Sequence, residues 1–264
     1  MNKWFRIAFE AVLWVSKVRN IEPPEQARKK ARVISKEFIE KFLPKIWINF
    51  DLKFWKESLQ RYPEIIKAIQ NYIKTWELSE DLPLLWLWNH QAFGLEAIWA
   101  YYYFPTNWRI VLKDDLLKPP FFWKWIKAID PIIFHRDKWK SSILRNAEIK
   151  RTLFQNNAVL VYPEWTRSKD GEIRWFDYKK YKSWFEVITR LKSSFSSKVA
   201  IITSDTFKVL PQTLEKNLLG FGKVNSWKII YTIDIIDASL YENIQEFNKE
   251  VKNILLKNLQ KEKS

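Results

Sequence analysis

Four short apolar runs in this sequence each end in polar groups that could take part in chemistry. In chain order, these groups are His90, Lys113, Arg136 and the trio Glu164, Thr166 and Arg167. A histidine just past a strand can act as a general base at neutral pH, and a nearby carboxylate would fix its tautomer. Lysine and arginine suit a phosphate, arginine through a planar fork of donors. The residue types therefore indicate a base beside an anion site.

Each of these residues also has an ordinary interpretation when it is taken alone. A single histidine after a strand is more often structural or at the surface than catalytic, and a lone cation there is usually a solvated charge. Four such groups in succession, each at the end of an apolar run, are hard to attribute to chance. We therefore treat them as one candidate site.

The elements that would position these groups follow from the pattern of apolar residues. Runs typical of buried strands occur at 83–88, 109–112, 131–134, 158–162, 199–202 and 227–235. Helices are predicted at 95–104, 120–128, 140–155, 180–191 and 240–260. This alternation predicts an α/β fold, with a mixed, mostly parallel sheet flanked by helices. Ligands bind at the carboxyl ends of strands in such sheets, where the polar groups fall.

The first 80 residues differ from the rest because their pattern is mainly helical. Helices are predicted at 3–18, 24–43 and 63–74. The helix at 3–18 would either lie at a membrane interface or pack on the core, and the basic side of 24–43 would be either solvated or lipid-facing. The polar stretch 79–81 marks a boundary between a helical region at 1–80, a candidate for membrane contact, and an α/β domain at 81–264.

Composition narrows the classes of partner and site. The net charge of +15 and the pI near 9.7 predict an anionic partner, either a membrane surface, a phosphorylated substrate or nucleic acid. Without cysteine and with two histidines, neither a disulfide nor a metal site is expected. The absence of an apolar run of 18 residues, and of a signal-peptide pattern, predicts the cytoplasm or the cytoplasmic face of the membrane.

The polar segments together resemble the sequence blocks of the glycerolipid acyltransferase family, typified by 1-acylglycerol-3-phosphate acyltransferases. The segments that carry the likeness are 89–96, 109–122, 131–137, 162–168 and 199–203, within a similar stretch of about residues 83–235. The most specific is Tyr-Pro-Glu-Trp-Thr-Arg-Ser at 162–168, which matches the family's Phe-Pro-Glu-Gly-Thr-Arg-Ser. The resemblance implies an α/β acyltransferase domain at 81–264.

The resemblance also implies roles for single residues. His90 would deprotonate the acceptor hydroxyl and Glu96 would orient His90, while Lys113, Arg136 and Arg167 would hold the acceptor's phosphate. Glu164, with Thr166, would shape the acceptor site. The donor would be acyl carrier protein, acyl-CoA or an acyl phosphate, and the acceptor a lysophospholipid, at an anionic membrane surface and without a cofactor. Base catalysis with oxyanion stabilisation suffices for a thioester.

Two positions depart from the family pattern. The family's orienting aspartate falls at Leu95, so either Glu96 replaces it across an extra residue in the turn, or the acid is missing. Thr203 stands where the last block usually has proline. Leu95 keeps open a non-catalytic lipid-binding homologue, and an acyltransferase for another lysolipid is a second alternative. A nucleic-acid role has only the net charge behind it, with no binding motif.

Glycine and tryptophan occur in abnormal numbers. A chain of this length would hold roughly 18 glycines at the usual frequency of about 7%. This chain holds 4 glycines and 16 tryptophans. Tryptophan stands where the family has small residues at positions 123, 125, 139, 165 and 184, and position 88 is a further candidate. One hypothesis is that UGA encodes glycine in this gene and was translated as tryptophan. The other is that the tryptophans anchor the protein at a membrane interface.

Overall fold

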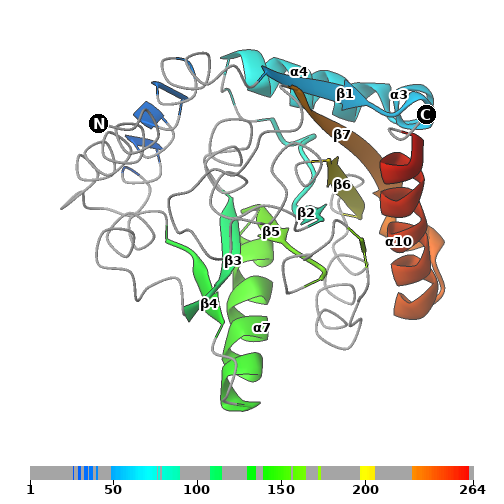
Figure 1. The fold of residues 1–264 in the computed structure, drawn as a ribbon. Helices are drawn as coiled ribbons and strands as arrows, with labels where there is room; N and C mark the ends of the chain where they lie inside the picture. The colour runs from blue at the N-terminus through cyan, green and yellow to red at the C-terminus, as the bar shows by residue number, and fades with distance from the viewer. Residues whose placement is uncertain are drawn as a thin grey trace, which may run out of the picture.

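The structure of the chain is a computed structural model (Figure 1). It describes residues 26, 29–30, 33–34, 36–37, 40, 49–75, 77, 79–89, 108–114, 130–134, 139–155, 157–164, 172–173, 197–205 and 228–261.

Seven strands among the described residues form one sheet, in the order β1-β7-β6-β2-β5-β3-β4 (Figure 1). Their bounds are β1 Asn49–Phe54, β2 Leu85–Trp88, β3 Arg109–Lys113, β4 Ile132–Phe134, β5 Val159–Val161, β6 Lys198–Ser204 and β7 Lys228–Asp237. From β6 to β4 every neighbouring pair is parallel, whereas β7 runs antiparallel to β6 and parallel to β1. The predicted mixed, mostly parallel sheet is confirmed.

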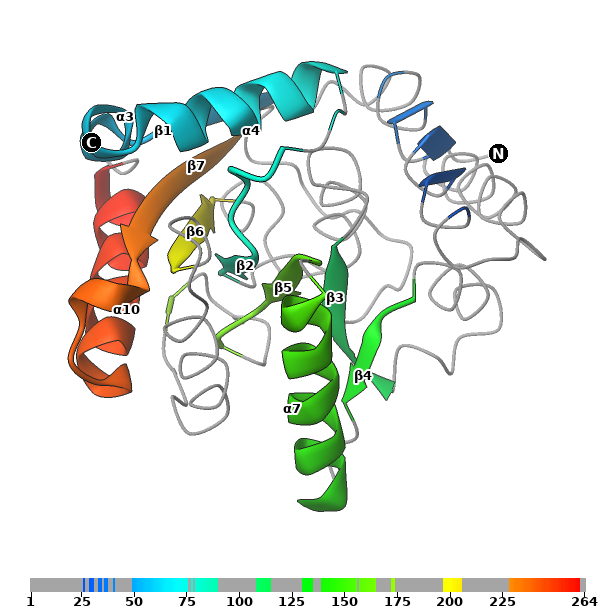
Figure 2. The same cartoon turned by 180° about the vertical axis from the view of Figure 1, so that it is seen from behind.

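Helices cover this sheet. Their bounds are α3 Lys56–Arg61, α4 Pro63–Thr75, α7 Trp139–Phe154 and α10 Ile244–Lys261, with a short 3-10 turn, η5, at Ala238–Leu240. Helix α7 packs on β4 and β5, and α10 packs on β6, as the two opposite views show (Figures 1 and 2). Flanking helices are therefore present as expected.

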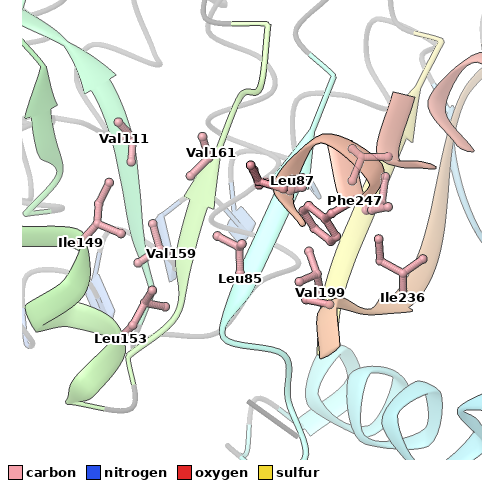
Figure 3. Packing of buried hydrophobic residues seen from close by; sticks show 14 of the residues in the cluster. Leu85, Leu87, Val111, Ile149, Leu153, Val159, Val161, Val199, Ile236 and Phe247 are labelled. Carbon is pink, nitrogen blue, oxygen red and sulfur yellow. The ribbon is translucent and has the colours of Figure 1, made fainter. Parts of the chain in front are cut away.

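One apolar cluster joins α7 and α10 to the same face of the sheet (Figure 3). Every second residue of the central strands points into it, from Leu85 and Leu87 on β2 to Val159 and Val161 on β5. The helices contribute Ile149, Leu153, Phe247, Val251 and Leu255. Full burial of such a side chain contributes roughly 1.5–3 kcal/mol, so this cluster holds the strand ends in a fixed frame.

The intervening residues of the central strands are buried as well. Trp86 and Leu160 are register partners and are almost fully buried, and Trp86 also pairs with Ala200. The small side chain of Ala200 leaves room for the indole, whose Nε1–H donates to Pro83 O at 2.7 Å. Strands buried on both faces read as continuous apolar runs, which explains why these segments were visible in the sequence.

The predicted elements correspond closely to the observed ones wherever the structure describes them. All six predicted strands are confirmed, as are the helices predicted at 63–74, 140–155 and 240–260. The described residues between 26 and 40 are helical. The helices predicted at 3–18, 95–104, 120–128 and 180–191 lie outside the described residues. No described helix is both long and apolar enough to cross a membrane.

Strand β1 was not predicted. It lies within the region 1–80 and pairs along its whole length with β7, from Asn49 opposite Lys228 to Phe54 opposite Ile233. The backbone ladder continues one residue further, because Trp55 N–H donates to Ile233 O at 3.0 Å. The predicted boundary near residue 80 stays a prediction, but part of the chain before it belongs to the sheet.

Candidate functional site

The carboxyl ends of the parallel strands meet at one edge of the sheet, here called the carboxyl edge. It is formed by the ends of β6, β2, β5, β3 and β4. From β2 the chain continues to β3, beyond β5, whereas from β5 it continues to β6, beyond β2. Neighbouring strands whose connections leave in opposite directions form a topological switch point, where ligands bind in open α/β sheets. The end of β2 and the end of β5 are therefore the expected centre of a site.

The sequence places predicted site residues directly after these two strands. Leu87 and Val161 are register partners, and His90 and Glu164 each come three residues further along the chain. His90 lies outside the described residues, as do Glu96, Arg136, Thr166 and Arg167, whose predicted roles stay predictions. Among the described residues, Glu164 and the backbone of Lys113 represent the predicted site.

Glu164 is buried at the end of β5, with 8% of its surface exposed. It follows the buried Pro163, which ends the strand because proline has no N–H for the ladder. A carboxylate is almost never buried unless a partner or a function requires it. Its place beside the switch point makes Glu164 a site candidate on structural grounds as well as on sequence.

Lys113 is the last residue of β3 and is paired in register with Phe134, the last residue of β4. Arg136 follows Phe134 by two residues in the sequence. The backbone therefore brings the two predicted phosphate-binding positions to neighbouring strand ends. The strands β2, β5, β3 and β4, which the predicted groups follow in the sequence, are adjacent in the sheet, and the placement of the groups themselves stays a prediction.

Three aromatic rings pack together near the ends of β2 and β5 and the start of β7. The ring centroid of Trp88 lies 6.1 Å from that of Tyr162 and 5.5 Å from that of Tyr231, the second pair edge to face. The Nε1–H of Trp88 donates to Ser204 Oγ at 3.2 Å. Trp88 is 1% exposed, so its indole is a packed, bonded part of the structure. A glycine at this position would leave that volume empty and remove the donor.

Two polar side chains at the carboxyl edge received no role from the sequence. Asn89 is fully buried, and its amide is bonded to the backbone of Ser204, the last residue of β6. Asp205 follows Ser204 and is 7% exposed. Its Oδ1 accepts from Ile230 N–H at 2.9 Å, so this carboxylate is turned toward β7, away from β2.

The described residues contain no cluster of three or more His, Asp or Glu side chains that could bind a metal ion. A base after β2, a buried carboxylate after β5 and cations after β3 and β4 can bind an anionic molecule and remove a proton from it.

Comparison with known proteins identifies a family whose model matches the part of the chain that contains this edge. The model of the family described as "Acyltransferase" matches residues 66–204, which is more than half of the chain. The matched range runs from α4 through the end of β6, and so includes every strand end of the candidate site.

The chain is also similar in sequence to one known protein and in fold to one solved structure. The chain is 26% identical over 159 residues to a 1-acyl-sn-glycerol-3-phosphate acyltransferase of Helicobacter pylori, covering 60% of this chain and 63% of that protein's length. Its fold resembles the crystal structure of the 1-acyl-sn-glycerophosphate (LPA) acyltransferase PlsC from Thermotoga maritima, with a TM-score of 0.62 and 17% identity. That alignment covers 99% of this chain and 94% of the other.

Proposed function

Because the chain belongs to the acyltransferase family, we propose that it transfers a fatty acyl group to the hydroxyl of 1-acylglycerol-3-phosphate in phospholipid synthesis. The donor would be a thioester of acyl carrier protein or CoA, or an acyl phosphate. The names of the Helicobacter and Thermotoga proteins support this acceptor, and the sequence blocks support it independently.

The observation that carries the proposal is that the strands directly before His90 and Glu164 are paired neighbours at the switch point. Both residues come three positions after the register pair Leu87 and Val161. Glu164 is buried there, which suits a residue that bonds a substrate hydroxyl rather than one that faces water. Lys113 and Arg136 follow the neighbouring strands, where cations would meet the acceptor's phosphate.

The proposed reaction is general-base catalysis of acyl transfer. His90 would take the proton from the acceptor hydroxyl, and the oxygen would attack the carbonyl carbon of the thioester. The new ester bond forms as the carbon–sulfur bond breaks, and the thiolate leaves and takes up a proton. Arg167 and Lys113 would hold the phosphate, Glu164 and Thr166 would hold the glycerol part, and Glu96 would orient His90.

The test is an assay of the purified protein with lysophosphatidate and three donors, namely acyl carrier protein, CoA and acyl phosphate derivatives of one fatty acid. We expect phosphatidate to form with at least one donor. If other lysolipids outcompete lysophosphatidate, the acceptor is wrong and the family assignment remains. If no acceptor is acylated while a lysolipid still binds, the protein is the non-catalytic homologue that Leu95 keeps open.

We also propose that the protein works at an anionic membrane surface. The net charge of +15 supports this, and Lys29 and Lys30 are exposed in the N-terminal helical segment. Each cation near an anionic leaflet contributes about 1 kcal/mol, and salt weakens the attraction. Binding to anionic vesicles should therefore fall with added salt and be weak on neutral vesicles. Binding that is equal on both kinds of vesicle would refute the electrostatic attachment.

The tryptophan positions lead to a proposal about the chain itself. We propose that position 165 is glycine in the native protein, because the turn after β5 must come close to the acceptor's phosphate. The coding DNA decides this: UGA codons at positions 165 and 184 would support it, and UGG codons there would refute it. The assays above should be run with glycine at every UGA position and, in parallel, with the printed sequence.

A further inference from the structure

Asn89 is joined to the end of β6 by both ends of its side-chain amide. Its Oδ1 accepts from Ser204 N–H at 2.7 Å, and its Nδ2 donates to Ser204 O at 2.9 Å. Both Asn89 and Ser204 have an exposed fraction of 0%. The side-chain amide therefore satisfies the two backbone groups of a residue that water cannot reach.

Backbone and aromatic contacts tie the same place together. Asn89 N–H donates to Ile202 O at 3.3 Å, which extends the ladder between β2 and β6 by one residue. Trp88, the preceding residue, donates its indole N–H to Ser204 Oγ. The last residue of β6 thus holds two consecutive residues at the end of β2.

The bonds matter energetically because neither partner has water as an alternative. A typical hydrogen bond contributes about 1 kcal/mol net, but a buried donor or acceptor left unpaired costs about 1–3 kcal/mol. Removal of the Asn89 amide would take away the hydrogen bond that it makes with Ser204 N–H and the one that it makes with Ser204 O. The end of β2 is therefore fixed against β6 more firmly than strand pairing alone would fix it.

The end of β6 is also bonded to helix α10. Asn258, on α10, donates from Nδ2 to Thr203 Oγ1 at 3.1 Å and to Asp234 Oδ2 at 2.6 Å. Like Asn89, this asparagine is buried, with 3% of its surface exposed. Two consecutive residues of β6, Thr203 and Ser204, are thus each bonded by the side-chain amide of a buried asparagine. Of these two asparagines, only Asn89 is next to His90 in the sequence.

We propose that Asn89 is a positioning residue for acyl transfer, which holds the turn carrying His90 in register with the end of β6. This inference rests on the proposed function, in which His90 is the base. A misplacement of about 1 Å at a reacting group costs on the order of 100-fold in rate. An amide that fixes the residue next to the base is therefore part of what makes that base effective.

The test compares two buried asparagines that bind neighbouring residues of one strand. Asn89→Ala and Asn258→Ala are measured for kcat, for KM of both substrates and for thermal unfolding. We expect Asn89→Ala to lower kcat on the order of 100-fold with KM changed less than about threefold. Asn258→Ala should lose similar stability and keep kcat within about threefold, because α10 does not carry the base.

A conservative variant adds a readout that a purely structural role would not move. In Asn89→Asp, the new side chain accepts from Ser204 N–H but donates to Ser204 O only when it is protonated. The ratio of variant to wild-type kcat should therefore rise as the pH falls. A ratio that does not change with pH, together with normal kcat in Asn89→Ala, would overturn the inference. If Asn89→Ala does not fold, the pH dependence of Asn89→Asp decides the question.

A direct view of the histidine separates this inference from the proposed function. The chain holds two histidines, so the ring signals of His90 and His135 can be assigned by NMR with a single His90→Ala sample. We expect Asn89→Ala to shift the titration of His90 and leave that of His135 unchanged. If wild type proves inactive and His90 still shifts, the proposed function fails and the positioning role stands. An unchanged His90 titration in Asn89→Ala overturns the positioning role.

Discussion

The two edges of the sheet are held together by different chemistry. At the edge where the parallel strands begin, the described contacts are ion pairs: Arg109 with Asp130 and Glu148, and Lys198 with Asp237. At the carboxyl edge, the amide of Asn89 joins β2 to β6, and the carboxylate of Asp205 joins β6 to β7. An ion pair of Lys228 with Asp51 joins β7 to β1 at the same end of the sheet. The cations that pair at the first edge, Arg109 and Lys198, are mostly buried, whereas Lys228 at the carboxyl edge is more than half exposed.

The pKa values of the first edge show how fully its charges are used. Burial would raise the pKa of Asp237, but hydrogen bonds from Lys198, Ser239 and Ser197 outweigh burial and hold it at about 2. Burial would likewise raise the pKa of Glu148, yet its bonds to Arg109 and Arg151 lower it. These carboxylates favour their charged form because a cation is already in place.

At the carboxyl edge, positive charge is in excess in several of the segments that follow the strands. The segments after β4, β5 and β6 each contain more basic than acidic residues, whereas the segment after β3 contains three of each and the segment after β2 contains one acidic and no basic residue. This is the arrangement expected if the edge receives a phosphorylated molecule or faces an anionic surface. Substitutions at the carboxyl edge should therefore lower activity, and substitutions at the opposite edge should lower stability.

The largest expected effect is that of His90→Ala. Loss of a general base typically costs about 100- to 10,000-fold in rate. Measurement of kcat and of thermal unfolding should show activity lost and the melting temperature retained. His135→Ala is the matched control and should stay near wild type. Full activity of His90→Ala would remove the base from the proposed mechanism.

Glu164→Gln should have the next largest effect on activity. The substitution keeps the size of the buried side chain and removes its charge, so one hydrogen bond to the acceptor changes from charged to neutral. We expect kcat/KM for the acceptor to fall by about tenfold or more, with KM for the acyl donor unchanged. Equal losses for donor and acceptor would show that Glu164 supports the fold of the edge rather than the acceptor.

Arg109→Met tests the opposite edge. The guanidinium of Arg109 donates to Asp130 O at 2.8 Å and to Thr152 Oγ1 at 3.1 Å, in addition to its two ion pairs. The Arg109 side chain is 13% exposed, and the side chains of Asp130 and Glu148 are 36% and 29% exposed, so removal of the cation leaves two partly buried carboxylates with one cation fewer. We expect a loss of about 2–3 kcal/mol in urea unfolding, with kcat within about twofold of wild type. A large fall in kcat at full stability would contradict the division between the edges.

Much of this arrangement could be predicted from the sequence, for a physical reason. The central strands are buried on both faces, so their segments are continuous apolar runs, and the polar groups that end them are conspicuous. Strand β1 was missed although 48–54 alternates apolar and polar residues, with Phe50, Leu52 and Phe54 separated by Asp51 and Lys53. Because helices are predicted on both sides of it, at 24–43 and 63–74, the whole region 1–80 was predicted to be helical.

What the sequence could not supply is the partner of a polar side chain. Asn89 stood beside the predicted base, but nothing in the chain links it to Ser204, which lies 115 residues further on. Likewise Ser58 and Asp234 are 176 residues apart and meet only because α3 follows an edge strand that pairs with β7. Such contacts depend on strand order, which an apolar pattern does not specify.

Asp234 lies between the two edges and predicts a pH effect on stability. Burial raises its pKa from 3.8 to about 6, against hydrogen bonds from Asn258 and Ser58. Between these values the folded chain binds a proton that the unfolded chain has lost, so this group's contribution to stability falls as pH rises through that window. We expect Asp234→Asn to stabilise the protein by about 1–3 kcal/mol at pH 8 and by less at pH 4, in urea unfolding at both values. Equal effects at both pH values would contradict the assignment.

The smallest effect should come from a charge pair that belongs to neither edge. Lys257 on α10 lies 3.6 Å from Glu57 on α3, and both side chains are about half exposed. Its Nζ also lies 4.8 Å from the ring centroid of Trp55. Exposed pairs contribute about 0.2–1 kcal/mol, so Lys257→Met should lower the unfolding free energy by less than about 1 kcal/mol and leave kcat unchanged.

High salt should remove most of the difference between Lys257→Met and wild type, because screening acts on exposed charges. The pair at Arg109 is largely buried, and its loss should persist in the same salt. Unfolding of both variants in low and high salt therefore separates charges that merely face each other in water from charges that hold an edge of the sheet. A salt-insensitive loss of more than about 2 kcal/mol in the unfolding free energy of Lys257→Met would show that α10 and α3 are also held together by an ion pair. The division between the two edges would then be wrong.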